Sequence, residues 1–165
     1  MDLKYTMKKT DMDINKISDY IIKKYPNCCL AYNIKNYDYY EEELIKECED
    51  FFYYEKLHWC GCGIPETAKK TIRDFLRILY DHKKELEHKH PDYDWRTDWT
   101  RRENNVQERF GAHDVYGNEL LLCFAYAMDA AEFTEHGSSI GGAWITEEGK
   151  MFLWLLEQND ELDND

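Results

Sequence analysis

Apolar residues recur at helical spacing over much of the chain. In three segments they return at intervals of three and four residues, the repeat of an α-helix with one buried face. The three segments cover residues 14–22, 44–52 and 72–79. Asp11 or Asp13 can cap the first of these helices, and Pro26 ends it near Tyr25. The third is expected to continue as far as Lys89.

The C-terminal third predicts two further helices and a hairpin. Residues 118–131 are nearly all apolar, which indicates a central helix that is buried. The glycine-rich residues 135–142 are typical of a tight turn, with 143–145 as the return strand of a small β-hairpin. Thr146 is expected to cap the last helix. The predicted core residues of these two helices are Leu121, Leu122, Phe124, Ala125, Met128, Leu153 and Leu156.

Two stretches lack a clear period. Residues 33–38 are rich in Asn and are interpreted as a turn. Residues 91–117 have the weakest pattern, and within them 92–95 and 97–99 are interpreted as turns with aromatic anchors. The length of 165 residues fits one domain. We therefore expect a mainly α fold: a single acidic domain, residues 1–165, of five or six helices with a small β-hairpin near 134–145 and an acidic tail at 160–165.

Composition narrows the classes of function. The chain carries 21 Lys and Arg against 34 Asp and Glu, a net charge of −13. Aromatic residues make up 15%, which excludes a disordered chain. No apolar run approaches the roughly 20 residues that span a membrane, and the first residues lack the apolar stretch of a signal peptide. The expected location is the cytoplasm of a bacterium or of a phage's host.

The strongest chemical signal is the segment that contains His58, Cys60 and Cys62. In an extended loop, side chains two apart point to the same side, so an imidazole and two thiolates can converge on zinc. A fourth ligand would come from Cys28, Cys29, His113 or His136. However, a single residue between the cysteines is tighter than in most zinc loops. The alternatives are a glycine-rich turn with two buried thiols, or an anion held ahead of a helix that starts at Pro65.

A second candidate for chemistry surrounds His136, which is followed by Ser138 and Ser139. A nucleophilic serine needs a base within hydrogen-bond reach and a third group that orients the base. Asp114 or Glu135 can supply that third group. A tight turn whose polar side chains cap backbone groups explains the same residues more simply.

The second predicted helix combines acidic and aromatic residues that suit a protein contact. Carboxylates on this helix would attract a basic partner, and tyrosines beside them can supply buried anchors. Glu41 belongs to the same acidic run. The proposed contact residues are Tyr39, Tyr40, Glu42, Glu43, Glu47, Asp50, Tyr53 and Tyr54.

Two resemblances to known proteins add context. Residues 115–158, and above all the stretch Trp-Ile-Thr-Glu-Glu-Gly-Lys at 144–150, resemble the wing and following helix start of winged-helix regulators, which implies DNA binding. The acidic charge of the same region opposes that function. Residues 57–66 and 133–150 resemble small uncharacterised proteins of phages and mobile elements in Gram-positive bacteria. That resemblance carries no activity and implies only a phage-like setting.

The sequence therefore favours a non-enzymatic, acidic accessory protein that binds a basic protein surface and neither duplex DNA nor a membrane. In a phage-like setting, this partner would be a host protein that handles nucleic acids. Two alternatives stay open. One is a small metal-dependent or hydrolytic enzyme that uses His58, Cys60, Cys62 or His136, and the other is a diverged winged-helix regulator.

Overall fold

The computed structural model describes residues 12–57, 66–88 and 91–162, and within them the fold is mainly α with a small antiparallel hairpin, as predicted. The described part contains seven α-helices instead of five or six: α1 (Ile14–Lys24), α2 (Cys29–Asn36), α3 (Glu41–Asp50), α4 (Glu66–Glu87), α5 (Trp95–Phe110), α6 (Glu119–Ala130) and α7 (Glu147–Leu162). The hairpin pairs β1 (Thr134–Glu135) with β2 (Trp144–Ile145). Three short helical turns complete the chain: η1 (Phe51–Lys56), η2 (Val115–Gly117) and η3 (Ile140–Gly142).

The two helices that the apolar pattern missed are α2 and α5. The prediction of turns in these stretches is wrong because neither helix follows a simple apolar period. The sulfur of Cys28 caps α2 by accepting a hydrogen bond from the amide of Ala31 at 3.2 Å. The buried face of α5 consists of Asp98, Arg102 and Val106, which are spaced four apart but are mostly charged.

The two predicted caps are present. The carboxylate of Asp13 accepts the amide of Lys16 at 2.9 Å and starts α1, which ends before Tyr25. The hydroxyl of Thr146 accepts the amide of Gly149 at 3.1 Å and starts α7.

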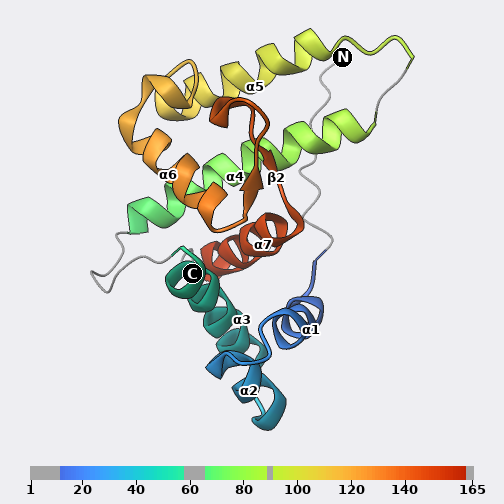
Figure 1. Cartoon of the computed structure of the whole chain (residues 1–165), viewed down its shortest axis with the longest axis vertical. Coiled ribbons are helices and arrows are strands. Elements are labelled where there is room, and N and C mark those ends of the chain that lie inside the picture. Colours follow the sequence, from blue (N-terminus) through green and yellow to red (C-terminus); the bar gives the residue numbers. More distant parts are fainter. Residues whose placement is uncertain (1–11, 58–65, 89–90, 163–165) are drawn as a thin grey trace.

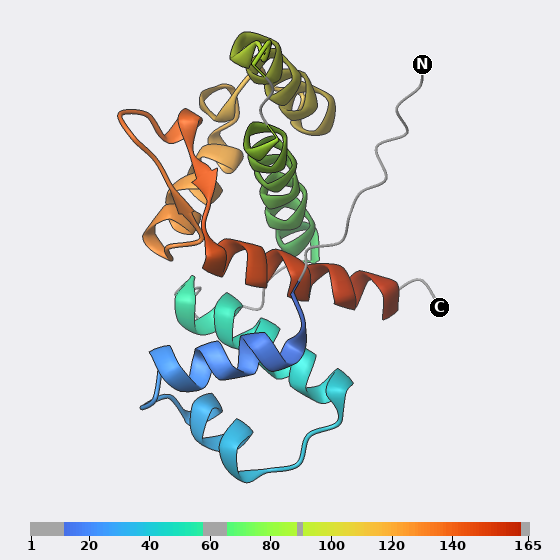
Figure 2. The same cartoon turned by 90° about the vertical axis from the view of Figure 1, so that its right-hand side faces the viewer.

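Helix α7 runs through the middle of the molecule (Figures 1 and 2). Helices α1, α2 and α3 lie on one side of it, and α4, α5, α6 and the hairpin lie on the other. Phe152 of α7 joins the two sides: its ring lies 6.0 Å from that of Phe52 and 4.7 Å from that of Phe133. All three phenylalanines are fully buried in one continuous hydrophobic core.

Helix α6 buries one face only, and α7 instead runs through the middle of the molecule, so the prediction of α6 as the central buried helix is wrong. Leu121, Phe124, Ala125 and Met128 face the core as predicted, but Leu122 is only partly covered. Two large side chains of α6 are exposed: Leu120, in the first turn, is 61% exposed, and Tyr126 is 54% exposed. Leu153 and Leu156 of α7 are buried as predicted.

Among the described residues, no helix combines the length and the apolar character needed to cross a membrane.

Candidate functional site

A cleft of about 580 Å³ lies between α1, the hairpin and the first turn of α7. We call it the acidic cleft, because five carboxylates line it against one lysine. Its lining residues are Tyr20, Lys24, Asp129, Glu132, Thr134, Glu135, His136, Trp144, Thr146, Glu147 and Glu148. We call the buried Glu148 with its partners the inner end of the cleft, and the exposed Glu135 and Trp144 with the residues around them the outer end.

The start of α7 places Glu148 at the inner end. Thr146 caps the helix, so Glu147 and Glu148 occupy its first turn, where the helix dipole favours carboxylates. The next residue must be glycine, because a Cβ at Gly149 would lie only 2.1 Å from the carbonyl oxygen of Phe133. The helix start is therefore pressed against the hairpin, and Glu148 is only 4% exposed.

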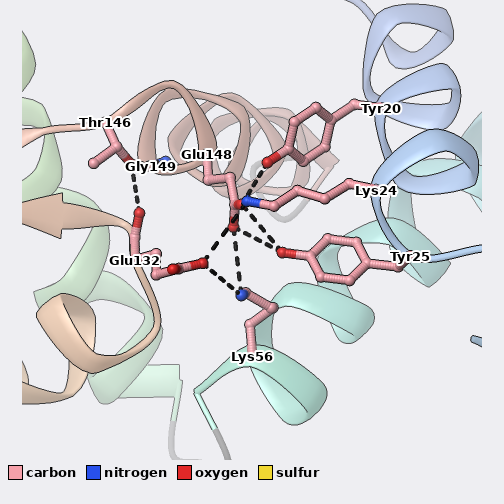
Figure 3. Close-up of polar contacts among 8 residues, drawn as sticks. All are labelled: Tyr20, Lys24, Tyr25, Lys56, Glu132, Thr146, Glu148 and Gly149. Atoms are coloured by element: carbon pink, nitrogen blue, oxygen red, sulfur yellow. Dashed lines mark hydrogen bonds and ion pairs between the residues drawn. The ribbon is translucent and has the colours of Figure 1, made fainter.

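Glu148 contacts four side chains from α1, its C-cap and η1 (Figure 3). The Tyr20 hydroxyl and the Lys24 ammonium donate to its Oε1, both from α1. The Tyr25 hydroxyl lies 3.1 Å from each carboxylate oxygen, and Lys56 Nζ of η1 lies 3.6 Å from Oε2. The carboxylate thus ties α1 and η1 to the start of α7.

The electrostatics of this cluster hold each group in its ordinary charge state. Burial alone would raise the pKa of Glu148, but hydrogen bonds from Lys24 and Tyr20 outweigh it and lower the pKa below its usual 4.5. Burial and the Glu148 hydrogen bond raise the pKa of Tyr20. Burial opposes the charge of Lys24, yet its hydrogen bond to Glu148 raises its pKa. None of the three groups is suited to exchanging protons near pH 7. The cluster therefore has a structural role: it holds α1 and η1 against the start of α7.

The outer end contains a histidine–carboxylate pair. Nδ1 of His136 lies 2.8 Å from Oδ1 of Asp129, so the carboxylate that orients this histidine is neither Asp114 nor Glu135. Asp114 instead caps η2. Beside this pair, the indole N–H of Trp144 donates to Oε2 of Glu135 at 3.3 Å.

The two serines that follow His136 do not act together with it. The Ser139 hydroxyl lies 2.8 Å from the hydroxyl of Tyr116 and accepts the amide of Gly141 at 3.2 Å. No hydrogen bond in the described part of the chain joins His136 to Ser138 or Ser139. The geometry thus matches the capped turn better than it matches a nucleophile and its base.

Buried Arg102 of α5 positions the loop that leads to Trp144, a role that no local pattern in the sequence indicates. Its guanidinium donates to the carbonyl oxygens of Gly141 at 2.9 Å and Ala143 at 3.0 Å. It also lies over the ring of Trp99, 5.0 Å from the centroid. Arg102 is only 5% exposed, and burial lowers its pKa to about 10, so the side chain is still charged at neutral pH.

The predicted zinc ligands His58, Cys60 and Cys62 lie outside the described residues. Of the four candidates for the fourth ligand, Cys28 caps α2 and His136 pairs with Asp129. Among the residues that the structure does describe, no three His, Cys, Asp or Glu side chains are grouped so that they could hold a metal ion.

The predicted protein contact on α3 is partly exposed. Tyr40 is 80% exposed, Tyr54 is 42% exposed, and Glu42, Glu43 and Glu47 are all exposed.

Other members of the predicted contact are less accessible. Tyr39 and Asp50 are half-buried. Tyr53 is fully buried under the ammonium of Lys69, 5.4 Å from its ring centroid, so its assignment as a surface contact is wrong. The π-helical turn η1 accounts for this, because it turns Phe51, Phe52 and Tyr53 inward together.

Two exposed tyrosines of the same region were missed. Tyr32 on α2 is 62% exposed, and Tyr37, just after α2, is 61% exposed. The signal was present in the sequence as the spacing of tyrosines between residues 32 and 40, but that stretch was interpreted as a turn. Tyr32, Tyr37, Tyr40, Glu41, Glu42, Glu43 and Glu47 are together called the tyrosine–glutamate surface below.

No family model, curated protein or solved structure matches this chain.

Proposed function

We propose that this protein is a non-enzymatic binding protein that docks onto a basic protein surface through the tyrosine–glutamate surface. The observation that carries the proposal is the exposure of three tyrosines at 61–80%: Tyr32 in α2, and Tyr37 and Tyr40 in the short link between α2 and α3. Large aromatic side chains left in solvent are the usual anchors of protein interfaces.

The charge of this surface indicates what kind of partner would bind it. Glu41, Glu42 and Glu43 form the first turn of α3, and all three are exposed. Carboxylates around aromatic anchors steer a positively charged surface into contact and repel an acidic one. Helix α2 lies at the end of the molecule opposite α5, and the link from α2 to α3 is at the same end (Figures 1 and 2).

Proteins that handle nucleic acids fit this description, because they present Lys and Arg to bind phosphates. A protein with exposed carboxylates in place of phosphates can occupy such a surface and block it. We therefore propose a host nucleic-acid-handling protein as the partner, inhibited by this chain in a phage-like setting.

The test is affinity capture from bacterial lysate with three tagged proteins. These are the wild type, the double variant Glu42→Lys/Glu43→Lys, and the control Glu108→Lys/Glu119→Lys, which makes the same charge change on α5 and α6. We expect one basic protein to be retained by the wild type and the control and lost by the first variant. The association rate with that protein, measured by biosensor, should fall as salt rises, because salt screens exposed charges.

Tyr40→Ala gives a second arm that leaves the charge unchanged. It should speed dissociation of the same partner, since it removes an anchor and not a steering charge. Equal retention by all the proteins, or equal loss in both charge variants, would show that the partner does not recognise this surface.

A further inference from the structure

The inner end of the acidic cleft already holds two ammonium groups of the chain itself. Lys24 Nζ lies 3.7 Å from Oε2 of Glu132 and also pairs with Glu148. Lys56 Nζ lies 3.5 Å from Oε2 of Glu132 and 3.6 Å from Oε2 of Glu148. Two carboxylates and two ammonium groups are therefore matched at this end (Figure 3).

Among the described residues that line the outer end, three are carboxylates and none is a lysine or arginine. Asp129, Glu135 and Glu147 line it, and Lys24 at the other end is the only Lys or Arg among the described residues that line the cleft. Asp129 is engaged by His136, and Glu147 Oε1 by Lys150 at 2.7 Å. Within the described part of the chain, the one partner of the Glu135 carboxylate is the indole N–H of Trp144, a neutral donor.

Two further groups at the cleft suit an ammonium ligand. Trp144 is 43% exposed, so part of its indole is open to a cation, and tryptophan is the strongest aromatic partner for one. Thr134 also lines the cleft and is only 2% exposed, yet its Oγ1 has no hydrogen-bond partner in the described part of the chain. A buried hydroxyl in that state is costly unless something else satisfies it.

From these contacts we propose that the outer end of the acidic cleft binds an organic cation bearing ammonium groups, with Glu135 and Trp144 as its principal contacts. A linear polyamine and a lysine side chain share this chemistry. The described side chains offer no cluster of three ligands for a single metal ion, whereas carboxylates spread along a cleft suit charges spread along a chain. The volume of about 580 Å³ lies within the usual range for small-molecule sites. The proposal does not depend on the tyrosine–glutamate surface.

The test is calorimetric titration of the full chain with spermidine at constant ionic strength. We expect saturable one-to-one binding that Glu135→Gln weakens by about tenfold, the effect of losing one contact worth about 1.4 kcal/mol. Glu108→Gln removes the same charge from exposed α5 and should bind within about twofold of the wild type. Trp144→Phe keeps an aromatic face and should weaken binding less than Trp144→Ala. Unfolding curves of all variants establish that they are folded.

A tri-lysine peptide separates the two sources of ammonium. Binding of spermidine alone assigns a free polyamine, and binding of the peptide alone assigns a lysine side chain of a partner. Glu42→Lys/Glu43→Lys should bind both probes as the wild type does, which separates this site from the proposed docking surface. The inference fails if neither probe saturates, if Glu108→Gln weakens binding as much as Glu135→Gln, or if Mg²⁺ displaces spermidine at equal concentration.

Discussion

Gly149 sits where the α7 start meets the hairpin, and a single methyl group there should be costly. Alanine favours a helix over glycine by about 1 kcal/mol, so propensity alone predicts that Gly149→Ala stabilises. The new Cβ would lie 2.1 Å from the Phe133 carbonyl oxygen and 2.8 Å from Cγ1 of Ile145. Overpacking against backbone outweighs the gain, and we expect a net loss of about 2–3 kcal/mol in urea unfolding.

Gly137 is the matched control for that substitution. A Cβ at Gly137 meets nothing within 4 Å, and its φ is not in the left-handed region. Gly137→Ala should change the unfolding free energy by less than about 0.5 kcal/mol. Equal effects at the two glycines would mean that α7 does not press against the hairpin as described.

Glu148 gives a prediction that depends on pH. At pH 7, Glu148→Gln should cost about 2 kcal/mol, because Lys24 and Lys56 lose the carboxylate between them while the half-exposed Lys24 can still turn to solvent. The pKa of Glu148 is lowered in the folded state, so its contribution is fully present above the unfolded value near 4.5 and is lost as pH falls through the folded value.

The measurement is urea unfolding of wild type and Glu148→Gln at pH 7 and at pH values below about 4. The difference between the two proteins should shrink in acid. Glu147→Gln, the exposed neighbour, should differ little from the wild type at either pH. A difference that is the same at all pH values would contradict the ion cluster.

Local signals predicted single residues well, and distant contacts could not be predicted. Asp13 and Thr146 are caps because their partners lie three residues away. The partners of Glu148 on α1 lie 124 and 128 positions away, so no spacing rule can pair them. The histidine–carboxylate pair shows the same limit at shorter range: the oriented residue, His136, was found, but its partner is Asp129.

At the level of whole elements, two apolar side chains of α6 differ in burial and should differ in their contribution to stability. Phe124 is 3% exposed and Leu120 is 61% exposed, although both lie in the same apolar run. Phe124→Ala should cost about 3–5 kcal/mol in unfolding free energy, the usual loss for a buried aromatic side chain. Leu120→Ala should cost less than about 1 kcal/mol. Similar losses at both positions would show that the outer face of α6 is also covered.

The errors at this scale have one physical origin. Periodicity reports which residues are apolar, and burial depends on what packs against them. An all-apolar run such as α6 carries no periodic signal to mark its exposed face. Conversely, α5 buries Asp98 and Arg102, so its inward face looked polar and the helix was missed. The prediction of a mainly α fold is confirmed because most helices, including α1 and α4, do bury an apolar stripe.

For the whole molecule, the net charge of −13 sets what the protein can approach. Different carboxylates dominate the tyrosine–glutamate surface and the acidic cleft, so both proposed sites favour positively charged ligands. The surface adds exposed tyrosines, whereas the cleft encloses a volume of about 580 Å³. Salt should weaken the first mainly through its association rate.

The same charge predicts that the protein does not bind duplex DNA, which argues against the winged-helix alternative suggested by the sequence of residues 144–150. Non-specific binding to DNA comes mainly from Lys and Arg that displace counterions from phosphates. Here the hairpin and the first turn of α7 contribute Glu135, Glu147 and Glu148 instead. Arg102, the nearest buried cation, is committed to the carbonyl oxygens of the glycine loop. A gel-shift titration with a random 30-base-pair duplex at about 0.15 M salt should show no complex at micromolar protein.

Replacing Glu135 and Glu147 by Lys should not create tight binding, since two charges supply only a small part of the phosphate contacts that a DNA-binding domain makes. A stable complex with the wild type would instead favour the winged-helix regulator and would exclude the proposed role of the acidic surface as a substitute for phosphates.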